Sequence, residues 1–144
     1  MTQDDHGKQP FVVDIEELTV ANNNFRTAVW TGEQLQMTVM SIPVGGDIGL
    51  ELHDENDQFL RIEQGEARVL MGDGPDNLTF DTPASDDFGI FIPKGTWHNV
   101  INTGDQPLKL YSIYAPSHHP AGTVHATRAE ADEAEALEHG EHHG

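Results

Sequence analysis

Short segments in which apolar and polar residues alternate run through most of the chain between residues 26 and 114. In residues 59–64, for example, Leu60 and Ile62 alternate with Arg61 and Glu63, a period typical of a strand with one buried face. Glycine-rich turn signals separate these segments, as at Gly45-Gly46. The pattern predicts strands at 26–31, 35–42, 49–52, 59–64, 67–71, 77–81, 88–92, 98–102 and 108–114. Many short strands at this spacing predict an all-β sandwich or barrel.

Both ends of the chain depart from this pattern. Residues 13–20 predict a short helix capped by Asp14, and Thr127 is a candidate cap for a helix from 128 to about 137. The predicted organisation is a flexible start (1–10), a β-barrel (11–116), an extension that packs near the barrel (117–127), and an acidic helix with a flexible histidine-rich tail (128–144).

Candidate chemistry lies in the predicted strand at 49–52 and just beyond it. Residues two apart on a strand share a face, so Glu51 and His53 point one way while Leu50 and Leu52 point the other. A carboxylate and an imidazole on one face, joined by a second imidazole such as His98, can form a metal site with oxygen and nitrogen ligands.

The spacing resembles the two signature motifs of the cupin superfamily over roughly residues 35–115. In the first motif, Gly45 and Gly65 fit both ends, and the places of the two histidines and the glutamate are taken by Glu51, His53 and Gln58. In the second, Asp87 replaces the opening glycine, and the matching residues are Pro93, Gly95, His98 and Asn102. The chain looks like a small single-domain cupin, of a branch with Glu-x-His and Asp-Gln in the first motif. The resemblance implies a double-stranded β-helix, or jelly-roll, barrel with short helical extensions at both ends and a metal ion inside.

The resemblance implies the ligand set Glu51, His53, Gln58 and His98. Compared with three imidazoles and one carboxylate, one nitrogen donor has become a harder oxygen donor. This change disfavours copper and favours manganese, iron(II) or zinc, with nickel also compatible. Two interpretations of Gln58 stay open, a weak fourth ligand or a hydrogen-bond partner of a bound water.

Three functions stay open at such a site. The first is a metal-dependent isomerase or lyase that acts as a Lewis acid on a small oxygenated metabolite, such as a sugar, a sugar phosphate or a carboxylic acid. The second is an iron(II) dioxygenase, and the third is a non-catalytic ligand-binding or metal-sensing module. No catalytic residue is assigned, and the candidates for the ligand pocket are Lys94, Asn102, Tyr111, Tyr114 and His125. His118 and His119 either fold over the barrel mouth as acid–base groups or belong to the surface or a dimer contact.

The composition limits the possible partners and location of the protein. Twenty-five acidic residues oppose seven basic ones, giving a net charge of −18, which argues against nucleic acid and favours a halophilic, high-salt cytoplasm. The chain has no cysteine and no long apolar run, and its first residues lack the pattern of a secretory signal, so we expect a cytoplasmic protein without a membrane span.

Two apolar features predict how the barrel is covered. Leu50 and Leu52 would be exposed on a lone barrel, so we expect a homodimer whose partner covers them, or a covering segment from residues 12–31. Trp97 is out of phase with His98 and is expected to pack on the opposite face of its strand.

Overall fold

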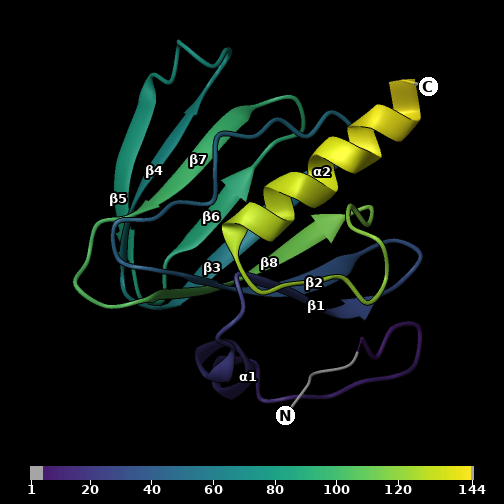
Figure 1. Cartoon of the computed structure of the whole chain (residues 1–144). Helices are drawn as coiled ribbons and strands as arrows, with labels where there is room; N and C mark the ends of the chain where they lie inside the picture. The colour runs from purple at the N-terminus through teal and green to yellow at the C-terminus, as the bar shows by residue number, and fades with distance from the viewer. Residues whose placement is uncertain (1–4, 144) are drawn as a thin grey trace.

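Two antiparallel sheets face each other and enclose the main apolar core, which confirms the all-β prediction (Figure 1). The computed structural model describes the backbone of residues 5–143 and the side chains of residues 5–136. The six-stranded sheet has the order β6-β3-β8-β2-β1-β9, and the three-stranded sheet has the order β5-β4-β7. The elements are α1 (Ile15–Ala21), β1 (Arg26–Thr31), β2 (Gln36–Ile42), β3 (Asp57–Gln64), β4 (Glu66–Gly72), β5 (Phe80–Ser85), β6 (Gly89–Ile92), β7 (Trp97–Asn102), β8 (Leu108–Ala115), β9 (Val124–His125) and α2 (Arg128–His143).

The predicted strand at 49–52 is the main departure from the expected pattern. Only one bridge, between Glu51 and His98, forms in this segment, and a second bridge joins Asp47 to Ile101. Gly49 lies between them with a φ of +95°, outside the range of an extended strand, so the pairing with β7 is interrupted there. Residues 43–56, the crossing loop, therefore form no regular strand but follow β7 and the turn before it, with backbone hydrogen bonds at Gly46, Ile48, Glu51 and His53.

Hydrogen bonds join the described part of the N-terminal segment to the barrel. Asp5 accepts from the backbone N–H of Thr31 at 3.0 Å and of Gly122 at 2.8 Å, while residues 1–4 of the predicted flexible start lie outside the described part. The α1 helix begins at Ile15, two residues after its predicted start, and has the predicted cap, because the Asp14 carboxylate accepts from the Glu17 N–H at 3.0 Å.

The outer face of the six-stranded sheet carries a second apolar cluster. Ile15 and Leu18 of α1 pack against its buried members, which are Val29, Met37, Val39 and Tyr111. Figure 1 shows α1 on this side of the sheet, away from the three-stranded sheet.

The α2 helix packs on the barrel through its first turns. Glu130 accepts from the N–H groups of Ala126 and Thr127, and Thr127 Oγ1 accepts from the Glu130 N–H, forming a reciprocal cap. Ala131 is only 3% exposed and belongs to the main core. The helix extends to His143, beyond its predicted end near residue 137; the side chains of the tail histidines, His139, His142 and His143, lie outside the described part. No helix in the described part is long and apolar enough to cross a membrane.

Candidate metal centre

Three side chains that the sequence singles out meet at one end of the barrel: Glu51, His53 and His98. Glu51 and His98 exchange both backbone hydrogen bonds at 2.9 Å, which fixes the crossing loop against β7. Gly95, at a φ of +76°, turns the chain before β7, and its N–H donates to the His53 carbonyl at 2.8 Å. Backbone contacts thus bring together residues that are more than forty positions apart in the sequence.

The ligand atoms of these three residues all lie within 4.8 Å of one another. Glu51 Oε2 is 3.2 Å from His53 Nε2 and 3.9 Å from His98 Nε2. His98 is fully buried, and His53 is 6% exposed. This compact set of one carboxylate and two imidazoles has the chemistry of a divalent transition-metal site.

The hydrogen bonding of the two histidines fits an ion as well. His98 Nδ1 lies 2.9 Å from the Thr96 carbonyl, which fixes the ring and directs Nε2 toward Glu51. His98 Nε2 and His53 Nδ1 are buried without a hydrogen-bond partner among the described residues, and His53 Nε2 faces the Glu51 carboxylate at 3.2 Å. Buried polar atoms normally have partners, and an ion that binds Glu51, His98 Nε2 and one nitrogen of His53 would supply them.

Arg26 supplies the positive charge next to this centre. Its guanidinium lies 3.9 Å from Glu51 Oε1, the oxygen that faces away from the imidazoles, and the side chain is 2% exposed. Burial opposes ionisation of Glu51, but the adjacent His53 and the charge of Arg26 outweigh it and lower the pKa of Glu51. Burial lowers the pKa of His98, which keeps its imidazole neutral and able to donate a lone pair.

Two further predicted residues lie near the centre. The Tyr114 ring is 5.8 Å from the His53 ring, and its hydroxyl is 3.4 Å from His119 Nε2. Gln58 is the cross-strand neighbour of Tyr114. Its Nε2 donates to Ser112 Oγ at 2.8 Å, while its Oε1 is buried without a hydrogen-bond partner in the described part of the chain. Whether Gln58 binds the ion directly stays a prediction.

The other predicted pocket residues lie apart from Glu51, His53 and His98. Tyr111 is three residues from Tyr114 on β8, so it faces the opposite side of the sheet and packs in the outer cluster under α1. Asn102 donates to the carbonyls of Ile42 and Gln106 and accepts from Gly104, so its amide is used within a turn. These two residues do not line the pocket.

Lys94 and His125 also differ from expectation. Lys94 is exposed in the turn before β7, where its backbone N–H donates to Asp57. His125 lies on β9, with Nδ1 3.4 Å from Arg26 Nη1, so it touches the arginine behind the centre and not the three ligands. Burial and the nearby Arg26 charge lower the pKa of His125.

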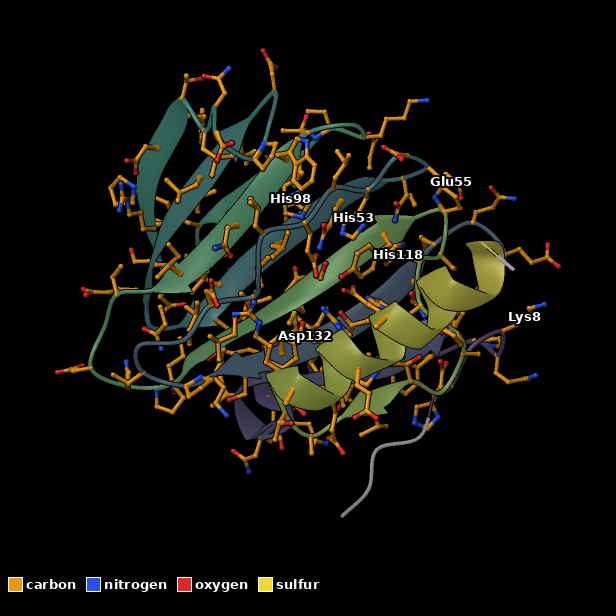
Figure 2. The ribbon with its side chains drawn as sticks, turned by 45° about the horizontal axis from the view of Figure 1, so that its top comes forward. Lys8, His53, Glu55, His98, His118 and Asp132 are labelled. Atoms are coloured by element: carbon orange, nitrogen blue, oxygen red, sulfur yellow. The ribbon has the colours of Figure 1, made fainter. Side chains whose placement is uncertain are left out.

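A cavity of about 670 Å³ opens onto Glu51 and His53. Its walls come from the crossing loop, the start of β7, the segment after β8 and α2, and they consist of Leu50, Glu51, Leu52, His53, Asp54, Glu55, Asn56, Trp97, His118 and Glu135. Figure 2 shows His98, His53 and His118 in a row that runs from β7 toward the end of β8. The His118 ring lies 4.2 Å from the His53 ring, so this histidine belongs to the mouth of the cavity.

Apolar residues border the mouth of this cavity. Leu50 is 40% exposed, and Leu50 and Leu52 both line the cavity, so whether a partner covers them stays a prediction. Trp97, the first residue of β7, also lines it, and as the neighbour of His98 on the strand it points to the opposite face. Arg26 and Glu135 are absent from the predicted site, and nothing in their local sequence indicates that folding brings them to it.

Comparisons with known proteins agree with this architecture. The cupin domain family matches residues 38–114. The chain is 60% identical over 131 residues to the uncharacterized protein YrkC of Bacillus subtilis, covering 91% of this chain and 70% of that protein. The crystal structure of BH2720 from Bacillus halodurans, at 60% identity, superposes with a TM-score of 0.90 over 90% of this chain and 98% of that chain. The uncharacterized protein L612 of Acanthamoeba polyphaga mimivirus is 38% identical over 124 residues, or 85% of this chain and 76% of that protein.

Proposed function

Because this chain belongs to the cupin domain family, we propose that it binds one divalent transition-metal ion through Glu51, His53 and His98 and acts on a small oxygenated metabolite as an isomerase or lyase. The observation that carries this proposal is the set of buried, unpartnered imidazole nitrogens beside an ionised carboxylate at the end of an open cavity. The donor set suits manganese, iron, zinc or nickel. The bound ion would supply Lewis acidity toward a hydroxyl, carbonyl or carboxylate oxygen.

The surrounding residues have separate roles in this proposal. Arg26 holds Glu51 ionised, and the Thr96 carbonyl orients His98. His118 and Glu135 line the cavity and are the side chains placed to move protons on a bound ligand. Burial and the charge of Glu51 raise the pKa of Glu135, which favours its protonated form more than at an exposed site.

An iron(II) dioxygenase is the second candidate. Two histidines and one carboxylate are the ligand set that leaves positions open for oxygen and substrate in non-haem iron enzymes. The non-catalytic module is the third, and the presence of His118 and Glu135 in the cavity favours an enzyme over it.

Metal content of the purified chain tests the proposal. The protein is best prepared untagged, with His139, His142 and His143 replaced by alanine so that the tail histidines bind no metal. Truncation before α2 is unsuitable because Ala131 is part of the core. We expect one equivalent of one transition metal per chain and none in the His53→Ala, His98→Ala variant. The exposed His6→Ala substitution is the matched control and should keep the metal. A chain that stays metal-free after reconstitution with all four metals would refute the proposal.

The native metal directs the next measurement. Iron with oxygen-dependent turnover would favour the dioxygenase, whereas manganese, zinc or nickel with oxygen-independent turnover that chelators abolish would favour the isomerase or lyase. Ligand-induced stabilisation without turnover would favour the binding module.

The assembly and location are proposals as well. We infer from the sequence a homodimer whose partner covers Leu50, which is 40% exposed, and a cytoplasmic, high-salt setting. A sedimentation measurement that gives a monomer at micromolar concentration would refute the homodimer.

A further inference from the structure

We propose that the cavity next to the metal centre takes a neutral polyhydroxylated ligand of the sugar or polyol class and rejects carboxylates and phosphates. The inference rests on the proposed function, because the metal ion would be the point of attachment. It narrows the ligand from any small oxygenated metabolite to one without charge.

The charge of the cavity wall is the first observation. Four of its lining residues are carboxylates, namely Glu51, Asp54, Glu55 and Glu135, and none of those in the described part is lysine or arginine. Pockets for carboxylates and phosphates present arginine, lysine or clustered N–H donors to the ligand. Here an anion would meet like charges as it enters, and juxtaposed like charges reject a ligand strongly.

The positive charges near the cavity do not exceed the negative charges that line it. Arg26 lies on the far side of Glu51, 3.9 Å from its Oε1, and is already opposed by that carboxylate. Arg26 and a divalent ion together bring three positive charges, and Glu51, Asp54 and Glu55 already match them without Glu135, whose pKa is raised. Lys94, the one lysine in the turn before β7, is exposed and does not line the cavity. The loaded cavity therefore has no surplus positive charge to offer an anionic ligand.

The same wall fits a ligand that is rich in hydroxyl groups. Carboxylate oxygens accept hydrogen bonds from hydroxyls without needing a proton of their own. Trp97 and His118 add flat rings, and Leu50 and Leu52 add apolar surface, against which the C–H faces of a sugar can pack. The cavity, at about 670 Å³, is within the range of pockets for small molecules.

His53 gives an observation independent of the carboxylates. It lines the cavity and is buried, and its Nδ1 has no hydrogen-bond partner among the described residues, while its Nε2 lies 3.2 Å from the Glu51 carboxylate. An ion held there binds oxygen donors such as a hydroxyl or carbonyl, whereas a protonated amine has no lone pair to offer. The charge of the cavity walls thus disfavours anions, and a protonated amine has no lone pair with which to bind the ion.

Binding of matched ligands to the manganese-loaded full chain tests this inference. The probes are D-glucose, D-galactose and D-mannitol, each beside its counterpart with a carboxylate at one end or a phosphate on its terminal hydroxyl. Calorimetry and the thermal midpoint give affinities in 50 mM and 500 mM NaCl. We expect at least one neutral probe to bind at least tenfold more tightly than both of its charged counterparts, with a smaller difference at high salt.

A variant with fewer carboxylates at the cavity mouth tests whether their charge causes the discrimination against charged ligands. Asp54→Asn, Glu55→Gln removes two exposed carboxylates at the cavity mouth, where Figure 2 shows Glu55 on the same side of the barrel as His118. It should reduce the discrimination against charged probes at least threefold. Asp73→Asn, Asp76→Asn in the β4–β5 hairpin removes the same charge elsewhere and should leave the discrimination unchanged.

The outcomes separate this inference from the metal proposal. Charged probes that bind as tightly as the neutral ones, or a metal-loaded chain that binds none of the neutral probes, would overturn the inference while the metal centre stands. A chain without metal would refute the proposed function. The comparison of neutral and charged probes on that metal-free protein would still decide the class of ligand, because the four wall carboxylates are present in both forms.

Discussion

Arg26 and Glu51 are the two opposite charges of the buried site, and each depends on the other. The guanidinium is 2% exposed, and its Nε has no hydrogen-bond partner in the described part of the chain. Removing one partner of a buried ion pair leaves an uncompensated charge, which typically costs about 3 kcal/mol. We expect Arg26→Met to lower the unfolding free energy of the metal-free protein by about this amount. Urea denaturation measures it, and bound manganese should recover part of the loss by taking over the charge of Glu51.

A double variant shows whether the loss comes from the pair. Glu51→Gln alone should also destabilise the metal-free chain, since it leaves Arg26 unpaired. The combined Arg26→Met, Glu51→Gln variant should lose less than the sum, by roughly 1–3 kcal/mol, because neither charge remains. Additive losses would mean that Arg26 stabilises the barrel by packing alone.

His119 should make the stability of the barrel depend on pH. The side chain is 6% exposed, and burial, with a further contribution from the Arg26 charge, holds its pKa well below the usual value of 6.5. The unfolded chain therefore binds a proton below pH 6.5 that the folded chain does not, so stability falls as the pH drops below that value. We expect His119→Gln to remove up to about 1.4 kcal/mol of this loss per pH unit. Urea denaturation of both chains in chelator at pH 7.5, 6.5 and 5.5 measures the difference; parallel pH curves would show that His119 protonates while the chain is folded.

Among the elements, α2 decides whether the cavity has its fourth wall. Ala131 places the helix on the core, and Glu135, one turn later, lines the cavity. We expect Ala131→Asp to cost at least about 2 kcal/mol, because it buries an unpaired carboxylate, and to increase amide hydrogen exchange in the described part of α2. The same substitution at the exposed Ala129 is the control and should change stability by less than about 0.5 kcal/mol. Equal effects at both positions would contradict the packing role of Ala131.

Strand elements were predictable where alternation and turn residues agree. β1 has the predicted limits, and most other strands differ by a few residues at their ends, but β5 overlaps its predicted segment only at residues 80–81 and β9 was not predicted. Asp87 shows why the second motif works without its opening glycine: its φ is +74°, a left-handed conformation that aspartate tolerates better than most residues. The crossing loop was predicted as a strand because alternation cannot show that Gly49 breaks the pairing. Arg26 and Glu135 could not be predicted as site residues, since their positions depend on how β1 and α2 pack against residues far along the chain.

At the scale of the whole molecule, salt should affect the acidic surface and the buried site differently. The net charge of −18 favours solubility and attracts cations, but it repels itself in the folded state. The stabilisation from the apolar core and the two sheets must exceed that repulsion, which acts mainly between exposed carboxylates. Salt screens charges beyond about 10 Å at 0.1 M and beyond about 3 Å at 1 M. A high-salt setting would therefore stabilise the fold while leaving the close contacts of Glu51 largely intact.

The salt dependence of the thermal midpoint tests whether repulsion among surface carboxylates lowers the stability of the fold. We expect the thermal midpoint of the chelated protein to rise as NaCl increases from 0.05 M to 1 M, because screening weakens the repulsion among exposed carboxylates. A variant with Asp73, Asp76, Asp86 and Asp105 changed to asparagine carries four fewer charges at exposed positions, so it should start from a higher midpoint and gain less from salt. Replacing NaCl with KCl should give the same response if the effect is screening and not the binding of one particular cation. An equal rise in the variant and the parent would instead assign the salt effect to stronger apolar burial, which does not depend on surface charge.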